Sequence, residues 1–329
     1  MPIEAARVYR KPAGFRAGPR LGLLALAFIA PRLHAAADLP GVREADATLA
    51  VGTVHYRDSG GKGPVVVFLH AGSGNSAVWE KQIAPLVAAG YRFVAYDRVA
   101  RNAGQGVGQG VGQSVDQSGA ELSQLMDSLG VRRFHLVGVA AGGGVALQYA
   151  LNNGARVLTL TIANSIGNVQ DPGYVALGQR LRPPAFNSLP LEFRELGPSY
   201  RAVDPDGVQR WLTLSQQGKP AESAPAGASG PPAGGPPPSG PPAGGAPTGG
   251  PAAGGGTPVT WAALEKLAIP TLLMTGDADL YTPPSVLRMF KQHMPAAELH
   301  IIPESGHASY WENPALFNST LLGFLKRHR

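Results

Sequence analysis

The chain contains no cysteine among its 329 residues, and charged residues make up only 15% of it. Without cysteine, a disulfide framework, a thiolate metal site and a cysteine nucleophile are all excluded. The most apolar run, residues 21–30, is too short to span a bilayer comfortably. The length and a hydrophobic content of 44% are nevertheless sufficient for one large domain or two ordinary ones with a sizeable core.

The net charge of +6 is concentrated at one end of the chain. Residues 1–37 carry six basic side chains against one acid, so the remainder is close to neutral. The folded part therefore offers no basic patch, and we expect no nucleic-acid partner.

The same segment has the pattern of a secretory signal. A basic start precedes the apolar run, and small residues (Ala35, Ala36 and Ala37) stand before Asp38. We expect residues 1–37 to be a signal peptide of a secreted or periplasmic protein, with no stable membrane insertion of the mature chain. The alternative is a disordered basic arm on a cytoplasmic protein.

Glycine and proline are concentrated in residues 218–258, which hold 13 Gly and 12 Pro without a Gly-X-Y period. This composition predicts a flexible or polyproline-type segment without chemistry, not collagen. A second low-complexity stretch, the Gly/Gln repeat at residues 105–114, lacks the strand, helix and Lys-Ser/Thr ending of a phosphate loop, so a surface loop is expected.

Apolar patterning predicts an alternation of strands and helices. Strands are expected at residues 48–56, 64–69, 91–96, 134–137, 157–163, 271–274 and 299–302, and helices at 76–89, 118–129, 142–151, 284–293 and 314–326. This order predicts an α/β fold with a mostly parallel sheet flanked by helices. The alternation stops between residues 165 and 264, so we expect core parts at 38–164 and 265–329, interrupted by a cap at 165–264.

The connection between the strand at 134–137 and the next helix has the sequence Gly138-Val-Ala140-Ala-Gly142. A nucleophile elbow of the form Gly-x-Ser-x-Gly needs small flanking residues, because its central residue sits in a sharp, strained turn above the sheet. The frame is present here, but its centre is Ala140. No serine, cysteine or aspartate lies elsewhere in it, so the attacking side chain is absent.

Three further motifs follow predicted strands. His70-Ala-Gly72-Ser-Gly74 comes after the first buried strand, Gly276-Asp-Ala-Asp279 after the strand at 271–274, and Ser305-Gly-His307 after the last strand. The chain order is therefore nucleophile position, acid, histidine, which distinguishes this arrangement from the other triad orders.

Together with Gly-His-x-x-x-Trp-Glu-x-Pro at residues 306–314, these motifs resemble the α/β-hydrolase superfamily, in its capped esterase, lactonase and C–C-bond hydrolase branches, over residues 48–327. The resemblance implies an α/β-hydrolase fold and no metal or organic cofactor. It also implies a site composed of Ala140 at the nucleophile position, His307 as general base, Asp279 orienting it, and the backbone N–H groups of Gly72 and Ala141 as oxyanion donors.

Several residues have a second interpretation. Asp277 is an alternative acid, although the family spacing favours Asp279 and leaves Asp277 as a turn residue. For His70 we favour local packing over catalysis, and for Trp311 and Glu312 a structural role. Five arginines of the expected cap are either solvated or bind a carboxylate: Arg180, Arg182, Arg194, Arg201 and Arg210.

Alanine at position 140 is compatible with three hypotheses. In the first, it replaces the serine of a hydrolase that acts on an ester or lactone of an apolar small molecule, as in an engineered knockout. In the second, the protein is a natural pseudohydrolase that binds a ligand under the cap. In the third, the dyad of His307 and Asp279 alone serves a lyase or cofactor-free oxygenase. We favour the first, because a lineage without hydrolysis would have no evident need for both an acid and a base. Leu, Phe and Tyr in the cap favour an apolar substrate.

Overall fold

The computed structural model describes residues 41–98, 111–217 and 258–329, with the backbone alone for 111–117. The expected signal peptide at 1–37 and nearly all of the Gly/Pro-rich segment at 218–258 lie outside the described residues. The described elements belong to one unit, Leu39–Arg329. Across these ranges, no helix has both the length and the apolar character needed to cross a membrane.

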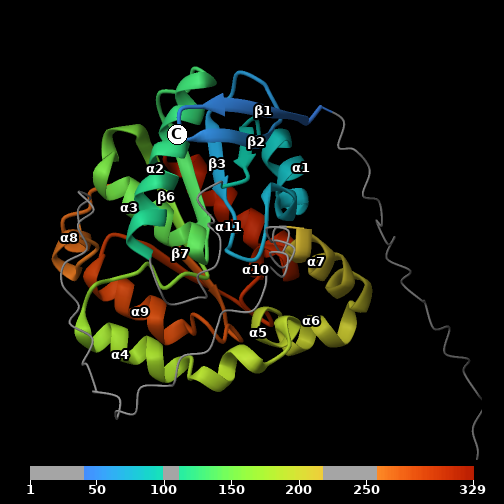
Figure 1. The fold of residues 1–329 in the computed structure, drawn as a ribbon, viewed down its shortest axis with the longest axis vertical. Coiled ribbons are helices and arrows are strands. Elements are labelled where there is room, and N and C mark those ends of the chain that lie inside the picture. Colours follow the sequence, from blue (N-terminus) through green and yellow to red (C-terminus); the bar gives the residue numbers. More distant parts are fainter. Residues whose placement is uncertain (1–40, 99–110, 218–257) are drawn as a thin grey trace, which may run out of the picture. The chain divides into compact units, whose positions relative to one another are not determined.

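The centre of the fold is an eight-stranded sheet with the strand order β1-β2-β4-β3-β5-β6-β7-β8 (Figure 1). The strands are β1 (Arg43–Leu49), β2 (Gly52–Asp58), β3 (Val65–Leu69), β4 (Arg92–Tyr96), β5 (Phe134–Val139), β6 (Val157–Ala163), β7 (Thr271–Gly276) and β8 (Glu298–Ile302). The neighbours in the run β4-β3-β5-β6-β7-β8 pair in parallel. Strand β2 pairs antiparallel with both β1 and β4. The expected mostly parallel sheet is confirmed.

The single strand expected at residues 48–56 is wrong. The chain forms a hairpin there, with β1 ending at Leu49 and β2 beginning at Gly52. Gly52 has a φ of 125°, a conformation that glycine adopts without the steric cost that a side chain brings. The reversal therefore lies inside the stretch that we expected to be continuous.

Helices cover both faces of the sheet. On one face, Val65, Val67 and Leu69 of β3 share a core with α2 (Val111–Ser128), α3 (Ala141–Asn152) and α9 (Pro284–His293). On the other face, Val66 and Phe68 share a core with η1 (Ser76–Trp79), α1 (Glu80–Ala88) and α11 (Pro314–Arg327). Successive strand side chains point to opposite faces, so burial of both faces explains the unbroken apolar run of β3.

Helix α2 begins at Val111, seven residues before the expected start. Ser118, the first residue of the expected helix, is buried inside α2. The preceding Gly/Gln-rich sequence has no apolar period, so nothing in it predicts helix.

Between β6 and β7 the chain leaves the sheet to form what we call the insert, residues 165–264. Its described elements are α4 (Pro172–Leu181), η3 (Pro184–Ser188), α5 (Leu191–Glu195), α6 (Pro198–Val203), α7 (Pro205–Gln217) and α8 (Trp261–Glu265). Proline begins α4, α6 and α7, where its fixed φ suits the first helical position. Leu196, Tyr200 and Trp211 of the insert are buried in the same core as α1 and α11. Helices α4, α5 and α6 lie on the side toward which the parallel strands point (Figure 1).

Candidate active site

Ala140 occupies a strained turn between β5 and α3. Its φ is 49° and its ψ is −118°, which is uncommon for a residue with a side chain. Four hydrogen bonds hold the turn. The Ala140 N–H donates to the Ala163 carbonyl (3.0 Å), and the Ala140 carbonyl accepts from the N–H groups of Gly143 (3.0 Å) and Gly144 (3.3 Å) and from Ser165 Oγ (2.6 Å). These hydrogen bonds hold the backbone of Ala140 in its strained conformation.

The two glycines that flank the elbow are required by close backbone contacts. A Cβ atom on Gly138 would collide with the Gly142 carbonyl. A Cβ atom on Gly142 would collide with the carbonyl oxygens of Leu69 and His70 at the end of β3. The spacing of these glycines therefore follows from the way α3 crosses the neighbouring strand.

Asp279 and His307 form a buried pair beyond the ends of β7 and β8. His307 Nδ1 lies 2.9 Å from Asp279 Oδ1 and 3.0 Å from Oδ2. The N–H groups of Tyr281 and Thr282 also donate to Oδ1, at 2.8 and 2.9 Å. Because an ionised carboxylate only accepts hydrogen bonds, His307 Nδ1 carries a proton and Nε2 of the neutral ring is left to accept one.

The electrostatics of the pair favour its charged form. Burial raises the pKa of Asp279, but the charge and hydrogen bond of His307, with the hydrogen bonds from Asn164 and Thr282, outweigh burial and lower it. Burial lowers the pKa of His307, but the charge and hydrogen bond of Asp279 outweigh this effect and raise it. The site therefore holds an ionised acid beside a histidine of raised basicity.

Asp277 lies apart from this pair in its contacts. Its Oδ1 accepts a hydrogen bond of 3.3 Å from the Ser305 N–H, which joins the loops after β7 and β8. Of the two acids in the Gly-Asp-Ala-Asp motif, Asp279 is the one that contacts His307.

Asn164, the residue directly after β6, was not predicted from the sequence. It is fully buried, with a φ of 48°. Its Nδ2 donates to Asp279 Oδ2 (2.9 Å) and to the Gly306 carbonyl (3.1 Å), while its Oδ1 accepts from Ser309 Oγ (2.6 Å). One signal was available in the sequence, since a polar residue directly after a buried strand lies at the edge where ligands bind in such sheets.

The two residues expected to supply oxyanion donors lie close together. A Cβ atom on Gly72 would be 3.8 Å from the Ala141 Cβ, an ordinary van der Waals contact. Ala141 is the first residue of α3, and the first N–H groups of a helix have no partner within it.

His70, two residues before Gly72, makes local hydrogen bonds through both ring nitrogens. Nδ1 lies 2.6 Å from the Ala71 carbonyl, and Nε2 accepts from the Arg98 N–H at 3.2 Å. These contacts place His70 in local packing at the end of β3.

The insert contacts the pair through Tyr281. The Tyr281 and His307 rings lie with centroids 4.4 Å apart, and Arg194 Nη1 donates to the Tyr281 hydroxyl at 3.0 Å. Arg182 lies near enough for its positive charge to oppose protonation of His307, as burial does, but Asp279 outweighs both and the pKa of His307 is raised overall.

Two other insert arginines have partners of their own. Arg210 pairs with Glu80 at 2.8 Å, and Arg201 lies 3.7 Å above the Phe193 ring. Neither of these contacts involves Asp279 or His307.

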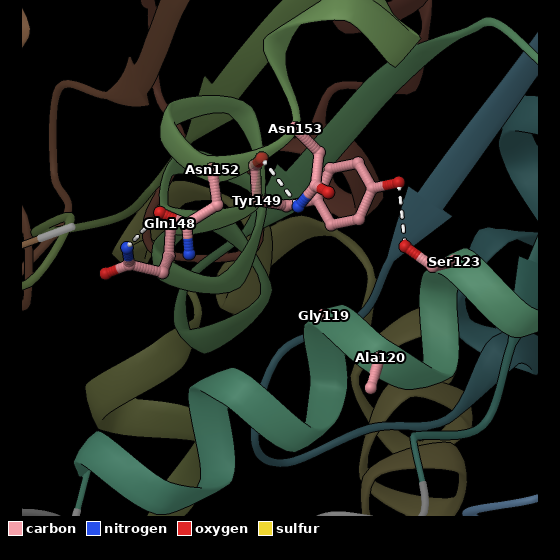
Figure 2. A pocket seen from close by; sticks show the side chains of 7 residues that line it. All are labelled: Gly119, Ala120, Ser123, Gln148, Tyr149, Asn152 and Asn153. Atoms are coloured by element: carbon pink, nitrogen blue, oxygen red, sulfur yellow. Dashed lines mark hydrogen bonds between the residues drawn. The ribbon is translucent and has the colours of Figure 1, made fainter. Parts of the chain in front are cut away.

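A pocket of about 170 Å³ lies elsewhere, between α2 and α3 (Figure 2). It is lined by Gly119, Ala120, Ser123, Gln148, Tyr149, Asn152 and Asn153. Apart from a 3.1 Å hydrogen bond between Ser123 Oγ and the Tyr149 hydroxyl, these side chains show no arrangement typical of acid–base chemistry. Within the described ranges, no three His, Asp or Glu side chains converge as metal ligands.

The sequence model of the alpha/beta hydrolase fold family matches residues 64–314. The chain is 27% identical over 278 residues to the 2-hydroxy-6-oxo-6-phenylhexa-2,4-dienoate hydrolase of Burkholderia cepacia, with 83% of this chain and 91% of the relative covered. Its fold resembles that of the enol-lactonase from Burkholderia xenovorans LB400, with a TM-score of 0.60, 18% identity, and 86% of this chain and 100% of that one covered. The fold also resembles that of a thermophilic esterase from Thermogutta terrifontis, with a TM-score of 0.61, 18% identity, and 87% of this chain and 100% of that one covered.

Proposed function

Because the chain belongs to the alpha/beta hydrolase fold family, we propose that it carries the site of a serine-type hydrolase whose nucleophile position is occupied by alanine. The substrate class is a carboxylic ester or lactone of an apolar small molecule. One observation carries the proposal: Ala140 has the strained backbone of a nucleophile elbow, with φ 49° and ψ −118°, but a side chain that cannot attack.

With serine at position 140, hydrolysis proceeds through an acyl-enzyme. His307 Nε2 takes the hydroxyl proton, the oxygen attacks the ester carbonyl, and the N–H groups of Gly72 and Ala141 stabilise the oxyanion. His307 then protonates the leaving alcohol, and water repeats the sequence on the acyl-enzyme. Asp279 stabilises the imidazolium at each stage, and its 2.9 Å hydrogen bond to His307 supports this role.

With alanine at position 140, turnover falls by about six orders of magnitude, because the acyl-enzyme cannot form. A ligand-binding pseudohydrolase, or dyad-only chemistry by His307 and Asp279, would require no serine at this position. If serine at position 140 gives no hydrolysis, these two hypotheses replace the hydrolase proposal.

Apolar side chains around Tyr281 support an apolar substrate. Phe186 of the insert packs edge-on against the Tyr281 ring at 4.9 Å. Leu280 and Phe193, which adjoin Tyr281 and Arg194 in the sequence, remain about half exposed, at 47% and 51%. We therefore assign the cap role to the insert, residues 165–264, as the element that contacts the acyl or alcohol group.

A second candidate substrate class carries a carboxylate, like the dienoate in the name of the Burkholderia cepacia relative. Arg182 favours it, because its positive charge reaches His307 and its Nε donates only a long hydrogen bond of 3.4 Å to the Gly178 carbonyl. A guanidinium is well suited to bind a carboxylate in a bidentate manner.

The test is hydrolysis of short and medium p-nitrophenyl esters by the chain, its Ala140→Ser variant and a matched Ala141→Ser variant. We expect turnover and an acyl adduct by mass spectrometry only with Ala140→Ser, because Ala141 is the neighbouring position and not the centre of the elbow. Folded but inactive Ala140→Ser protein, also inactive toward a hydroxy-oxo-dienoate, would overturn the proposal.

We also propose export of the protein, on the signal-like sequence of residues 1–37. Expression of the full chain in a bacterium, followed by fractionation and intact mass measurement, tests it. Cleavage close to Asp38 with recovery outside the cytoplasm is expected, and an uncleaved cytoplasmic chain is the contrary result.

A further inference from the structure

The insert and the loop that carries His307 approach each other backbone to backbone. A Cβ atom on Gly306 would lie 2.5 Å from the Gly197 nitrogen, and one on Gly197 would lie 2.9 Å from the Gly306 nitrogen. Neither distance is tolerated by a real side chain. Both positions therefore require glycine for a contact between segments that are far apart in the sequence.

The carboxylate of Glu312 lies at this contact and binds both segments. Glu312 ends the short helix α10 (Ser309–Glu312). Its Oε2 accepts from the Gly197 N–H at 2.7 Å, both of its oxygens accept from the Gly306 N–H at 2.9 and 3.0 Å, and Oε1 accepts from the Ala308 N–H at 3.2 Å. The backbone on each side of His307 is thus tied to one carboxylate that also holds the insert.

The insert also binds His307 directly. The carbonyl of Glu195, two residues before Gly197, accepts hydrogen bonds from the His307 N–H (2.7 Å) and the Ala308 N–H (3.1 Å). The imidazole is fixed at Nδ1 by Asp279, whereas its backbone is fixed by the insert and Glu312. Docking of the insert and placement of His307 are therefore a single structural arrangement.

We propose that Glu312 is a positioning residue that couples docking of the insert to the orientation of His307. The kinetic part of this inference rests on the proposed hydrolase function. Removal of the carboxylate leaves N–H groups at a partly buried contact without their acceptor, which favours movement of the loop. A displacement of about 1 Å at a catalytic group costs up to about 100-fold in rate.

The kinetic test compares Glu312→Gln, Gly197→Ala and the double variant in the Ala140→Ser background. The Glu312→Gln side chain keeps one oxygen but loses the second acceptor, and a Cβ at position 197 would lie 2.9 Å from Glu312 Oε2, so each change breaks the same contact. We expect each single variant to lower kcat by about 10- to 100-fold with KM altered much less. Because both act on one contact, the double variant is no slower than the slower single variant.

The matched control is Glu298→Gln, which removes a carboxylate that pairs with Arg327 at 2.5 Å on the surface. This variant leaves kcat unchanged. Multiplicative losses in the double variant, or equal losses with Glu298→Gln, would overturn the coupling.

A second readout needs no turnover and uses the chain with Ala140. The proton on His307 Nδ1 is shared with Asp279 and gives a downfield proton resonance, which is assigned by its disappearance in His307→Gln. Glu312→Gln and Gly197→Ala each shift this resonance, whereas Glu298→Gln leaves it in place. An unshifted resonance in folded Glu312→Gln and Gly197→Ala protein contradicts the inference, even where Ala140→Ser proves inactive and the hydrolase proposal fails separately.

Discussion

The side-chain amide of Asn164 donates a hydrogen bond of 2.9 Å to Oδ2 of Asp279, which follows it by 115 residues. Asp279 is thereby held from two directions, since its Oδ1 accepts from the N–H groups of Tyr281 and Thr282. The orientation of Asp279 toward His307 is therefore fixed by Asn164, directly after β6, and by the turn after β7.

Replacement of Asn164 with alanine is predicted to lower the free energy of unfolding by about 2–4 kcal/mol, because it removes three buried hydrogen bonds, those to Asp279, the Gly306 carbonyl and Ser309. Urea unfolding monitored by circular dichroism measures the effect. Asn168→Ala is the matched control, since Asn168 also has a positive φ, 55°, but is not a hydrogen-bond partner of Asp279. A loss of equal size in both variants would assign the effect to backbone conformation and not to the hydrogen bonds.

The pair of Asp279 and His307 is predicted to stabilise the fold within a defined pH window. The folded-state pKa of His307 is raised above 6.5, so its contribution is complete below pH 6.5 and is lost as pH rises through the raised value. The folded-state pKa of Asp279 is lowered below 3.8, so its contribution is present above pH 3.8 and is lost as pH falls further.

The stability difference between the chain and Asp279→Asn is accordingly largest between about pH 4 and 6.5. Chemical unfolding at a series of pH values measures it. Asp277→Asn is the matched control, because it alters the other acid of the motif, whose side chain accepts from the Ser305 N–H. A flat difference for Asp279→Asn, or the same profile for Asp277→Asn, contradicts the assignment.

His135 is predicted to destabilise the fold in acid. Burial in β5, with smaller contributions from the charges of His328 and Arg329, lowers its pKa from 6.5 to about 4. Between pH 6.5 and 4, His135 therefore binds a proton in the unfolded chain but stays neutral in the folded chain. The free energy of unfolding falls by up to about 3 kcal/mol as pH falls from 6.5 to 4.

His135→Gln can still hydrogen-bond to Thr159, the partner of His135 Nδ1 at 2.9 Å, but has no proton to gain. This loss should therefore disappear in the variant. His300→Gln, at an exposed position of β8, reports any effect of removing a histidine as such. If His135→Gln loses as much stability between pH 6.5 and 4 as the unchanged chain does, another group is responsible for the loss.

Two glycine-to-alanine changes are predicted to alter the thermal stability in opposite directions. Gly142→Ala places a methyl group against the carbonyl oxygens of Leu69 and His70 and lowers the melting temperature by several degrees. Gly119→Ala, in α2, meets only the Tyr149 ring at 3.8 Å and gains about 0.5–1 kcal/mol from helix propensity (Figure 2). Differential scanning fluorimetry distinguishes them, and a tolerated Gly142→Ala would show that the elbow can shift away from β3.

The elements predicted most accurately are those whose signal is local. The buried run of β3 and the Gly-x-x-x-Gly frame around Ala140 can be identified from consecutive residues, because double-sided burial and a sharp turn each impose a short pattern. The hairpin of β1 and β2 was missed because its turn carries a single glycine within a strand-like stretch. Asn164 was missed because its partners lie 115 and 142 residues away.

The amino-acid sequence by itself determined the alternation of strands and helices, the small residues of the elbow, and the alanine at its centre, because backbone conformation and burial act on neighbouring residues. The family spacing favoured Asp279 over Asp277, but only the tertiary structure shows the contact of Asp279 with His307. Tertiary structure alone decided that Asn164 holds the acid and that Glu312 joins the insert to the histidine loop. Each of these depends on hydrogen bonds between the ends of parallel strands, and the sheet brings those ends together only once the intervening segments have packed on its two faces.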